Sequence, residues 1–376
     1  MRIFESDEAT SFLIHRVKHP SEARSFLKSG QPFDEWRNET RAWVQQNLRF
    51  APEAVLPEVE ILEEKEFNGY VRRHIVFHSS EMNRVTAYLL VPHNAKNAPG
   101  VMALHDHSGR FYWGKEKIVE NNPPLPVADH LQNWRYGGRA YASDLARRGY
   151  VVMCPDSFGF GDRKFLRESW LRAGEEERVG LAQGTEAFIN AYDQSYQAGN
   201  QGRIMDMINH AGWTYPGIQV WDDRRALDVL LAQPEVDSTR IGCVGLSMGG
   251  FRAVMLGSMD ERITCSIPVG FMARHRDLLP YKTSGAGFCL SGVYDELPWP
   301  DFATLMAPRH MLVLNCANDA LYDLSSMQIA SEHIAKVYDK AGASGKYDYK
   351  FYTVGHQFDA NMQDDAFAWM DGILRP

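Results

Sequence analysis

Length, composition and charge bound the class of protein. The chain of 376 residues is 44% hydrophobic and 23% charged, which is typical of a folded globular protein and excludes an intrinsically disordered one. Its 40 lysines and arginines are outnumbered by 48 aspartates and glutamates, so the formal net charge is −8. An acidic chain is not attracted to nucleic acid or to anionic membranes, so we expect neither as a partner. No stretch approaches the roughly 20 apolar residues of a membrane span.

The start of the chain and its cysteines indicate a compartment. The first ten residues, MRIFESDEAT, are acidic where a signal peptide has a basic segment before an apolar run. The cysteines number five, are widely spaced, and include no C-x-x-C pair for metal binding or redox chemistry. Cys154, Cys243 and Cys316 lie in apolar strand-like runs. We therefore predict reduced, buried thiols in a cytoplasmic protein.

The first 90 residues predict helices followed by antiparallel strands. We expect a helical extension over residues 1–55, because SEARSFLKSG and FDEWRNETRAWVQQNL are typical of helices and two prolines then punctuate the chain. Asn68-Gly69 suits a hairpin turn between the first two strands, since both residues tolerate positive φ. The strand-like runs are residues 58–64, 70–78 and 85–91.

From residue 100 onward, short apolar runs alternate with helix-like segments. Such alternation predicts a mostly parallel sheet with helices on both faces, so the fold class is α/β. Residues 160–216 interrupt the pattern with mixed polarity and several glycines, and we expect an insertion there that covers part of the site. The strand-like runs are 100–104, 150–154, 240–245, 265–268, 311–316 and 347–353, and the helix-like segments are 138–148, 220–232, 249–259, 325–341 and 360–374.

One short segment has the pattern of a serine nucleophile. Residues 245–249, GLSMG, match the motif G-x-S-x-G, and they lie between an apolar strand and a helix-like segment. Glycines on both sides permit the sharp turn that raises the Ser247 hydroxyl above the carboxyl ends of the strands, where open α/β sheets bind ligands. Met248 would begin the helix with its N–H free to stabilise an oxyanion. The alternative is a chance match in a glycine-rich turn, and the strand–turn–helix setting argues against it.

A serine nucleophile needs a general base, and four histidines follow Ser247 in the chain. His356 lies directly after the last strand-like run, where a loop can return over the sheet. His310 begins a strand and so lies at the opposite end of the sheet, while His333 falls in the middle of a helix and is expected on its surface. We predict His356 as the base, with His275, in a loop after CSIPVG, as its rival.

The base in turn needs an acid that orients it. The run MLVLNC is followed by Ala-Asn-Asp, so Asp319 comes just after a strand end and faces the same rim of the sheet. Asp323, four residues on, suits the N-cap of the following helix. We predict Asp319 as the acid, and Asp323, Asp295 and Glu296 are the alternatives.

The loop LHDHSG, after the first core strand, is expected to provide the second oxyanion N–H. We predict His107 as that donor through its main chain. Two histidines around Asp106 also suggest metal ligands, but no third cluster accompanies them, and His105 is better explained as a structural histidine beneath the loop. Tyr112 and Trp113 follow closely and are predicted to line the substrate pocket or its rim.

Four consecutive charged residues, Asp222, Asp223, Arg224 and Arg225, precede the helix that comes before the strand leading to Ser247. Charged residues at this place are typical of a solvated helix start with salt bridges. We expect that role in preference to substrate binding.

Taken in chain order, these residues resemble the α/β-hydrolase superfamily and, more narrowly, its branch of dienelactone-hydrolase-like and acetyl-xylan-esterase-like proteins. The matching pieces are LHDHSG, GYVVMCPDSFGFGDR, WDDRRALDVLLAQPEVDSTRIGCVGLSMGG, NCANDALYD and VGHQFD, between residues 85 and 370. The resemblance implies an α/β-hydrolase catalytic domain over residues 56–376, with antiparallel strands at its start and the insertion before the elbow helix. The N-terminal 55 residues match no family pattern.

Two departures limit what the resemblance implies. Dienelactone hydrolases proper have a cysteine nucleophile, whereas position 247 is serine, so their substrate is not carried over. The usual oxyanion loop reads H-G-x, and Asp106 replaces that glycine. The main-chain geometry of this loop is therefore left open.

The resemblance implies hydrolysis of a small carboxylic ester through an acyl-serine intermediate, as in a carboxylesterase or deacetylase, with no metal or cofactor. An acylaminoacyl-type peptidase would share the triad, although such enzymes carry a large β-rich domain. A C–C bond hydrolase with an N-terminal helical cap and a non-enzymatic binding protein on the same fold are further alternatives. Substrate identity stays open, and so does the oligomeric state, with a homo-oligomer among the options.

Overall fold

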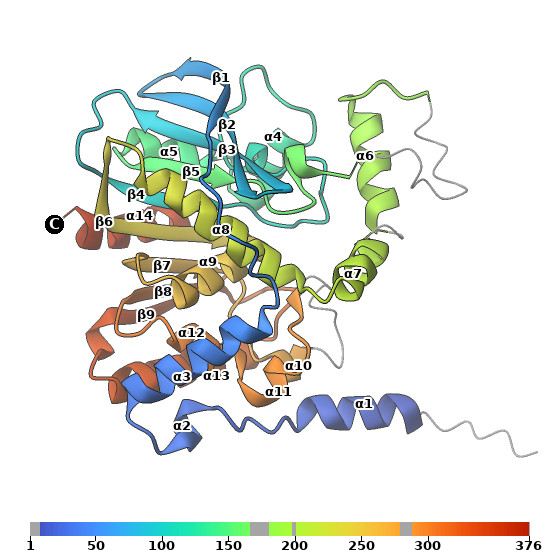
Figure 1. Ribbon diagram of the computed structural model, residues 1–376, viewed down its shortest axis with the longest axis vertical. Coiled ribbons are helices and arrows are strands. Elements are labelled where there is room, and N and C mark those ends of the chain that lie inside the picture. The colour runs from blue at the N-terminus through green and yellow to red at the C-terminus, as the bar shows by residue number, and fades with distance from the viewer. Residues whose placement is uncertain (1–7, 166–179, 198–200, 279–287, 376) are drawn as a thin grey trace, which may run out of the picture.

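The computed structural model describes residues 8–165, 180–197, 201–278 and 288–375. Nine strands form one open sheet in the order β1-β2-β3-β5-β4-β6-β7-β8-β9 (Figure 1). The strands are β1 (Glu60–Phe67), β2 (Tyr70–Ser80), β3 (Asn83–Pro92), β4 (Ala98–Leu104), β5 (Val151–Pro155), β6 (Val236–Leu246), β7 (Cys265–Val269), β8 (His310–Cys316) and β9 (Tyr347–Tyr352).

The first three strands are antiparallel. β1 and β2 form a hairpin in which Phe67 pairs with Tyr70 across Asn68-Gly69, and Gly69 has a φ of 93°. β3 returns beside β2 and then pairs antiparallel with β5. The predicted strands and the predicted hairpin turn are therefore confirmed.

The other strands run parallel from β5 across to β9. Because parallel strands all end at the same edge, the loops that follow β4, β6, β7, β8 and β9 meet there. Every one of these strands lies where the apolar runs predicted it. Successive buried side chains along them point alternately into two separate apolar clusters, one on each face of the sheet.

Helices cover both faces, as predicted from the alternation with strands. On one face α8 (Tyr215–Leu231), α9 (Met248–Met259), α12 (Trp299–Thr304) and α13 (Leu324–Lys340) contribute to the larger apolar cluster. On the other face α5 (Tyr141–Arg147) and α14 (Ala360–Leu374) contribute to the smaller one. Shorter helices lie in the connections: α4 (Ala128–Arg135), α10 (His275–Leu278) and α11 (Val293–Glu296).

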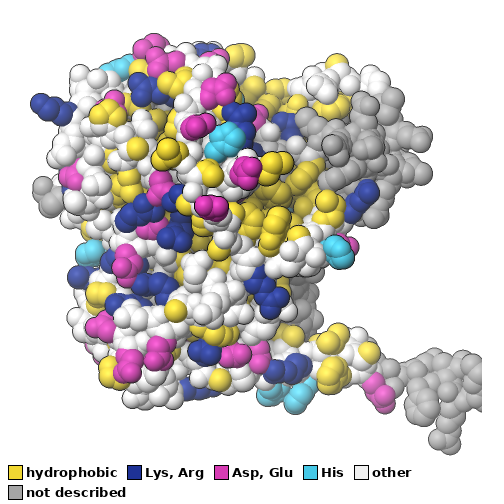
Figure 2. Space-filling model, viewed as in Figure 1, with side chains coloured by type: hydrophobic (Ala, Val, Ile, Leu, Met, Phe, Trp, Pro, Cys, Tyr) yellow, Lys and Arg dark blue, Asp and Glu magenta, His cyan; other side chains and the backbone are white. Residues whose placement is uncertain are grey.

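The N-terminal segment is helical and partly docked on the hydrolase-like body. α3 (Phe33–Asn47) buries Trp36 and Val44 and lies against α9. α2 is shorter than predicted and covers only Phe26–Ser29. α1 (Glu8–Lys18) projects from the body with no buried residue, and its Phe12 and Leu13 are 69% and 62% exposed (Figures 1 and 2).

The predicted insertion at residues 160–216 contains α6 (Glu186–Ser195) and α7 (Gln201–His210), which stand beside the sheet in Figure 1. Residues 166–179 and 198–200 of this insertion lie outside the described part of the chain. Thr185 is the N-cap of α6, because its side chain accepts a hydrogen bond from the Phe188 N–H. Its Asp193 then accepts hydrogen bonds from the N–H groups of Phe111 and Tyr112, which ties the insertion to the loop after β4.

The prediction that Asp222 and Asp223 are exposed to solvent is wrong. α8 begins earlier, at a Thr214 cap whose hydroxyl accepts from the Gly217 N–H, so both carboxylates lie inside the helix and are buried. Asp223 pairs with the buried Arg252 of α9 at 2.6 Å, and Asp222 pairs with Arg163 at 2.7 Å. The expected salt bridges are present: those of Asp222 and Asp223 are buried and join elements, whereas Arg224 pairs with Asp260 and Arg225 pairs with Asp228 of the same helix, both at more exposed positions.

Two further predictions can be compared with the structure. All five cysteines are free, and Cys154, Cys243, Cys265 and Cys316 are buried as expected, whereas the prediction of a buried thiol is wrong for Cys289, which is exposed. Among the described helices, none combines the length and the apolar character needed to cross a membrane.

Candidate active site

Ser247 occupies the corner between β6 and α9 in a strained backbone conformation. Its φ of 58° and ψ of −115° are uncommon for a residue with a side chain, and such strain is concentrated at functional sites. The Ser247 N–H donates to the Val269 carbonyl at 2.8 Å, so β7 holds the corner from one side. Ser247 as a residue is half-buried and lies at the edge where the parallel strands end.

The glycines around Ser247 are required by close backbone contact. A Cβ built at Gly245 or at Gly249 would overlap the carbonyl oxygen of Leu104, the last residue of β4. The corner and the end of β4 can therefore approach only because these two positions lack side chains. Met248 is the first residue of α9, so its N–H has no partner within the helix.

His356 and Asp319 are brought together although 37 positions separate them. His356 Nδ1 lies 2.7 Å from Asp319 Oδ2, and the Asp319 side chain has no exposed surface. The other carboxylate oxygen accepts the Leu321 N–H at 2.7 Å, which fixes the orientation of the carboxylate. Because a carboxylate accepts, Nδ1 is the donor in this pair, and Nε2 of the neutral imidazole is left as an acceptor.

Gly270 links this pair to the serine corner. It follows Val269, which accepts the Ser247 N–H, and a Cβ at Gly270 would lie 3.4 Å from Cε1 of the His356 ring. The serine corner and the imidazole thus lie on either side of the end of β7. Tyr322 closes the other side of the imidazole, with ring centroids 6.2 Å apart.

The loop after β4 passes beside the same corner. His105 is fully buried and satisfied, since its Nδ1 contacts the Asp106 carbonyl at 3.0 Å and its Nε2 accepts the Ser157 N–H at 3.0 Å. The structural role expected for His105 is therefore confirmed. The Asp106 carboxylate, which replaces the glycine of the usual motif, turns away into the interior and accepts the Tyr136 hydroxyl at 2.5 Å.

His107 is a neutral imidazole in this loop. Burial and, to a smaller extent, the nearby Lys117 ammonium lower its pKa to about 4. Its Nδ1 accepts the Gly109 N–H at 2.9 Å, which closes a tight turn through Ser108, a residue with a φ of 48°. The imidazole of His107 therefore stabilises the turn, whereas its main-chain N–H is not part of that contact.

Arg135, which sequence reasoning missed, joins the two loops of the site. Its Nη1 donates to the His356 carbonyl at 2.5 Å, and its Nε donates to the Ser108 hydroxyl at 3.2 Å. The guanidinium also covers the ring of Trp134 at 3.6 Å. No motif marks this arginine, because its partners are a main-chain oxygen and a serine that are distant in sequence.

The predicted pocket residues Tyr112 and Trp113 have other contacts. Tyr112 is largely buried and packs edge-on against Phe188 and Tyr192 of α6. The Trp113 indole donates to the Pro126 carbonyl at 2.8 Å. Tyr112 is thus attached to the insertion and Trp113 to the segment around Pro126, and a role of either residue in substrate binding stays a prediction.

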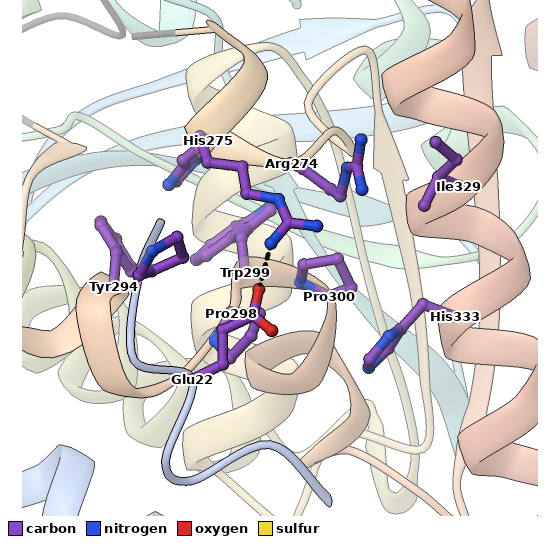
Figure 3. A pocket seen from close by; sticks show the side chains of 11 residues that line it. Glu22, Arg274, His275, Tyr294, Pro298, Trp299, Pro300, Ile329 and His333 are labelled. Carbon is purple, nitrogen blue, oxygen red and sulfur yellow. Dashed lines mark hydrogen bonds and ion pairs between the residues drawn. The ribbon is translucent and has the colours of Figure 1, made fainter. Parts of the chain in front are cut away.

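His275, the predicted rival of His356, lies with His333 at a separate cavity. His275 is buried in α10, stacked on Trp299 with ring centroids 5.3 Å apart, and His333 is partly buried with its Nε2 3.0 Å from Asp301, which corrects its expected place on the helix surface. Both line a cavity of about 140 Å³ between the N-terminal segment and α12 and α13 (Figure 3). The Glu22–Arg276 ion pair crosses this cavity, and neither Ser247 nor His356 lines it.

Three carboxylates near the loop after β4 have the spacing of metal ligands. Oxygens of Glu116, Asp156 and Asp162 lie within 4.8 Å of one another. The Lys115 ammonium lies among them, at 2.8, 2.8 and 2.6 Å, and their charge raises its pKa well above the usual value against the effect of burial. The Lys115 ammonium thus supplies the positive charge that pairs with the three carboxylates.

An open, mostly parallel sheet with a strained serine at the strand-to-helix corner and an aspartate–histidine pair beyond it defines the α/β-hydrolase class. The chain belongs to the Abhydrolase family (Abhydrolase_7), which it matches over residues 11–352.

Individual relatives agree with this assignment. "Putative hydrolase YtaP" of Bacillus subtilis (strain 168) is 23% identical over 295 residues, covering 77% of this chain and 84% of that protein. A "putative acetyl xylan esterase" from Bacteroides fragilis NCTC 9343 has a similar structure, with a TM-score of 0.69 at 15% identity over 93% of this chain and 83% of the other. A glucuronoyl esterase from Solibacter usitatus gives a TM-score of 0.61 at 15% identity, over 93% and 96% of the two chains.

Proposed function

We propose that the protein is a serine esterase that cleaves a carboxylic ester, with Ser247 as nucleophile, His356 as general base and Asp319 as the acid that orients it. One observation carries this proposal: the Asp319–His356 pair, at 2.7 Å, lies across Gly270 from the strained Ser247 corner. The same three residue types in this chain order perform acyl transfer on this fold.

The reaction follows from the donor and acceptor roles of the pair. His356 Nε2 takes the hydroxyl proton of Ser247 while Oγ bonds to the ester carbonyl carbon, and Asp319 stabilises the imidazolium that forms. The imidazolium then protonates the leaving alcohol as the C–O bond breaks. A water molecule repeats the attack on the acyl-serine, releases the carboxylic acid and restores the hydroxyl.

The tetrahedral intermediate needs donors for its oxyanion. We assign the N–H of Met248, which has no partner in α9, and the main-chain N–H of His107 to this role. Removing one such donor costs about 10²–10³-fold in kcat in serine hydrolases.

The substrate class is a small ester, and the relatives favour a carbohydrate ester. The solved structures of similar fold include one named "putative acetyl xylan esterase" and a glucuronoyl esterase, and both names refer to esters of carbohydrates. We therefore propose a short acyl ester of a sugar or of a similar alcohol. The N-terminal residues 1–55 and the insertion 160–216 are the segments proposed to select it, since within the described residues neither contributes a strand to the sheet that carries Ser247, Asp319 and His356.

A cytoplasmic location belongs to the same proposal. It is supported by the five free cysteines, four of them buried, because reducing compartments keep thiols unpaired.

The test is a panel of four substrates: p-nitrophenyl acetate, an acetylated sugar, an acylated peptide and a β-diketone. We expect hydrolysis of the esters and a loss of at least about 10⁴-fold in Ser247→Ala and about 10⁴-fold in Asp319→Asn, which leaves the imidazole without its orienting carboxylate. Turnover of the β-diketone or the peptide without the esters would instead show a C–C hydrolase or a peptidase. Unchanged ester rates in Ser247→Ala would refute the proposal.

A further inference from the structure

Lys117 is a fully buried lysine whose hydrogen-bond partners are main-chain oxygens. It ends the 3₁₀ helix Lys115–Lys117, and its ammonium donates to the carbonyls of Asp106 and His107 at 2.9 and 3.2 Å. The Phe160 ring lies 5.1 Å from the same nitrogen. Burial lowers the pKa of Lys117, and the Asp106 carboxylate offsets part of that effect.

The adjacent Lys115 shows how unusual this arrangement is. Lys115 is buried to the same extent, but three carboxylates surround its ammonium. No ion pair within 4.0 Å is found for Lys117 in the described part of the chain. A buried ammonium is costly unless it is hydrogen-bonded, and here two successive carbonyls of the loop after β4 fulfil that need.

The planarity of the peptide bond turns this contact into a constraint on the loop. In a trans peptide the carbonyl and the following N–H point in opposite directions. With the carbonyls of Asp106 and His107 directed at Lys117, the N–H groups of His107 and Ser108 are directed away from it. Within the described residues neither N–H donates a hydrogen bond.

The backbone after these groups has the curvature of an anion-binding turn. Ser108 and Gly109 both have positive φ, at 48° and 65°, and for Ser108 this is a strained conformation. Successive N–H groups around such residues form a concavity that accepts an anion. The start of the loop also touches the serine corner, because a Cβ at Gly249 would lie 3.2 Å from the His105 carbonyl oxygen.

We propose that Lys117 is the positioning residue of the oxyanion hole: its ammonium fixes two successive peptide planes so that the N–H groups of His107 and Ser108 are presented to the oxyanion. This inference rests on the proposed esterase function and deepens it. It adds Ser108 as a donor and explains how Asp106 can replace the usual glycine, since the loop is held from beneath. The positive charge of the ammonium also polarises both peptide groups. Each carbonyl that accepts from Lys117 therefore makes the N–H of the same peptide group a stronger donor to the oxyanion.

The variant that tests the inference is Lys117→Met, which keeps the length of the side chain and removes the charge and the donors. Rates with p-nitrophenyl acetate are compared with those of its thiono analogue, in which sulfur replaces the carbonyl oxygen and is a poor acceptor for oxyanion donors. We expect kcat for the oxygen ester to fall by about 10²-fold, the loss typical of one oxyanion donor, with little change in KM. The preference for oxygen over sulfur should fall as well, and Lys117→Arg should restore part of both.

Lys115→Met is the matched control. It removes an ammonium that is equally buried, in the same 3₁₀ helix, but one that donates to carboxylates and not to the loop carbonyls. We expect it to lower Tm while leaving the oxygen-over-sulfur preference unchanged. If Lys117→Met also lowers both rates equally and keeps this preference, Lys117 is merely structural and the inference is overturned.

A crystal structure of Lys117→Met separates this inference from the esterase proposal. Rotation of the Asp106–His107 or His107–Ser108 peptide supports positioning whatever ester the enzyme cleaves. Peptides that keep their orientation contradict it. If the wild type hydrolyses none of the esters faster than Ser247→Ala does, the esterase proposal is refuted. The orientation of the two peptides in the crystal still decides the role of Lys117.

Discussion

Gly270 shows how a single position without a side chain supports the proposed chemistry. Its φ of 60° lies in the left-handed region, and a Cβ there would lie 3.3 Å from Leu246 and 3.4 Å from the His356 ring. The neighbouring Val269 holds Ser247 through its carbonyl. A residue with a side chain would therefore strain the backbone and press on the imidazole at the same time.

We predict that Gly270→Ala impairs activity more than stability. The positive φ should cost about 1–2 kcal/mol of unfolding free energy, whereas displacement of the imidazole should lower kcat/KM by about 10²-fold. Urea unfolding and ester kinetics on the same preparation measure both effects. Gly342→Ala is the control, because Gly342 has a similar φ of 68° with no atom near its missing Cβ. It should show the stability loss and normal activity, and equal activity losses in the two variants would contradict the argument.

Residue by residue, what the sequence could predict depended on local context. Ser247, Asp319 and His356 were recognisable because each follows a strand end in the expected chain order, and the structure brings Asp319 and His356 into contact. Lys117 and Arg135 were not, because Lys117 donates to the main-chain oxygens of Asp106 and His107 and Arg135 to that of His356. A hydrogen bond to a main-chain oxygen requires no particular side chain at the partner position, so it produces no motif in the sequence.

At the scale of elements, the helix that carries Ser247 at its start is fastened by a buried ion pair. Arg252 of α9 donates to Asp223 of α8 through Nε and Nη2, at 2.9 and 2.6 Å, and also to the Pro155 carbonyl at the end of β5. Both side chains are at most 3% exposed. This pair fixes α9 against α8 and the sheet.

We predict that Asp223→Ala destabilises the protein by about 3–5 kcal/mol, because it leaves the buried Arg252 guanidinium without its counter-charge. Chemical denaturation with a two-state fit measures the change. The control is Glu60→Gln, which breaks the exposed Arg84–Glu60 pair on the sheet edge and should cost less than about 1 kcal/mol. A similar small loss in both variants would show that the buried pair has little net effect.

The elements themselves were largely predictable, and the misreading at Asp222 and Asp223 shows the limit. The nine strands and the helices α5, α8, α9, α13 and α14 lie close to their predicted positions, whereas α4, α6, α7, α10, α11 and α12 were not predicted. The four consecutive charges indicated a helix start, but α8 begins at a Thr214 cap, and Asp222 and Asp223 face buried arginines from other elements. A single sequence does not show that the partners of a charge come from elsewhere in the fold.

At the scale of the whole molecule, burial of histidine links stability to pH. His275 is 7% exposed, and burial lowers its pKa from 6.5 to about 4. Arg274 and Arg276 line the same cavity as His275, and Glu22 is paired with Arg276. The unfolded chain takes up a proton near pH 6.5 but the folded state only near pH 4, so stability falls as pH falls through this range and is unaffected by His275 above it.

We predict that His275→Phe reduces the acid sensitivity of the fold. Phenylalanine can keep the stacking on Trp299 without a titratable group. Between pH 7 and pH 4.5 the wild type should lose about 2–3 kcal/mol more unfolding free energy than the variant. Urea unfolding at the two pH values measures this difference. Parallel losses in the two proteins would mean that His275 titrates normally in the folded state.

The claim on which the account depends is that Ser247 is the activated nucleophile. The most direct measurement is peptide mapping by mass spectrometry after treatment with a fluorophosphonate, which phosphonylates serines that a base has activated. The account predicts one adduct, on the peptide that contains Ser247, formed much more slowly in His356→Ala and absent in Ser247→Ala. An unlabelled Ser247 in the wild type, or an adduct on another serine that persists in Ser247→Ala, would contradict it.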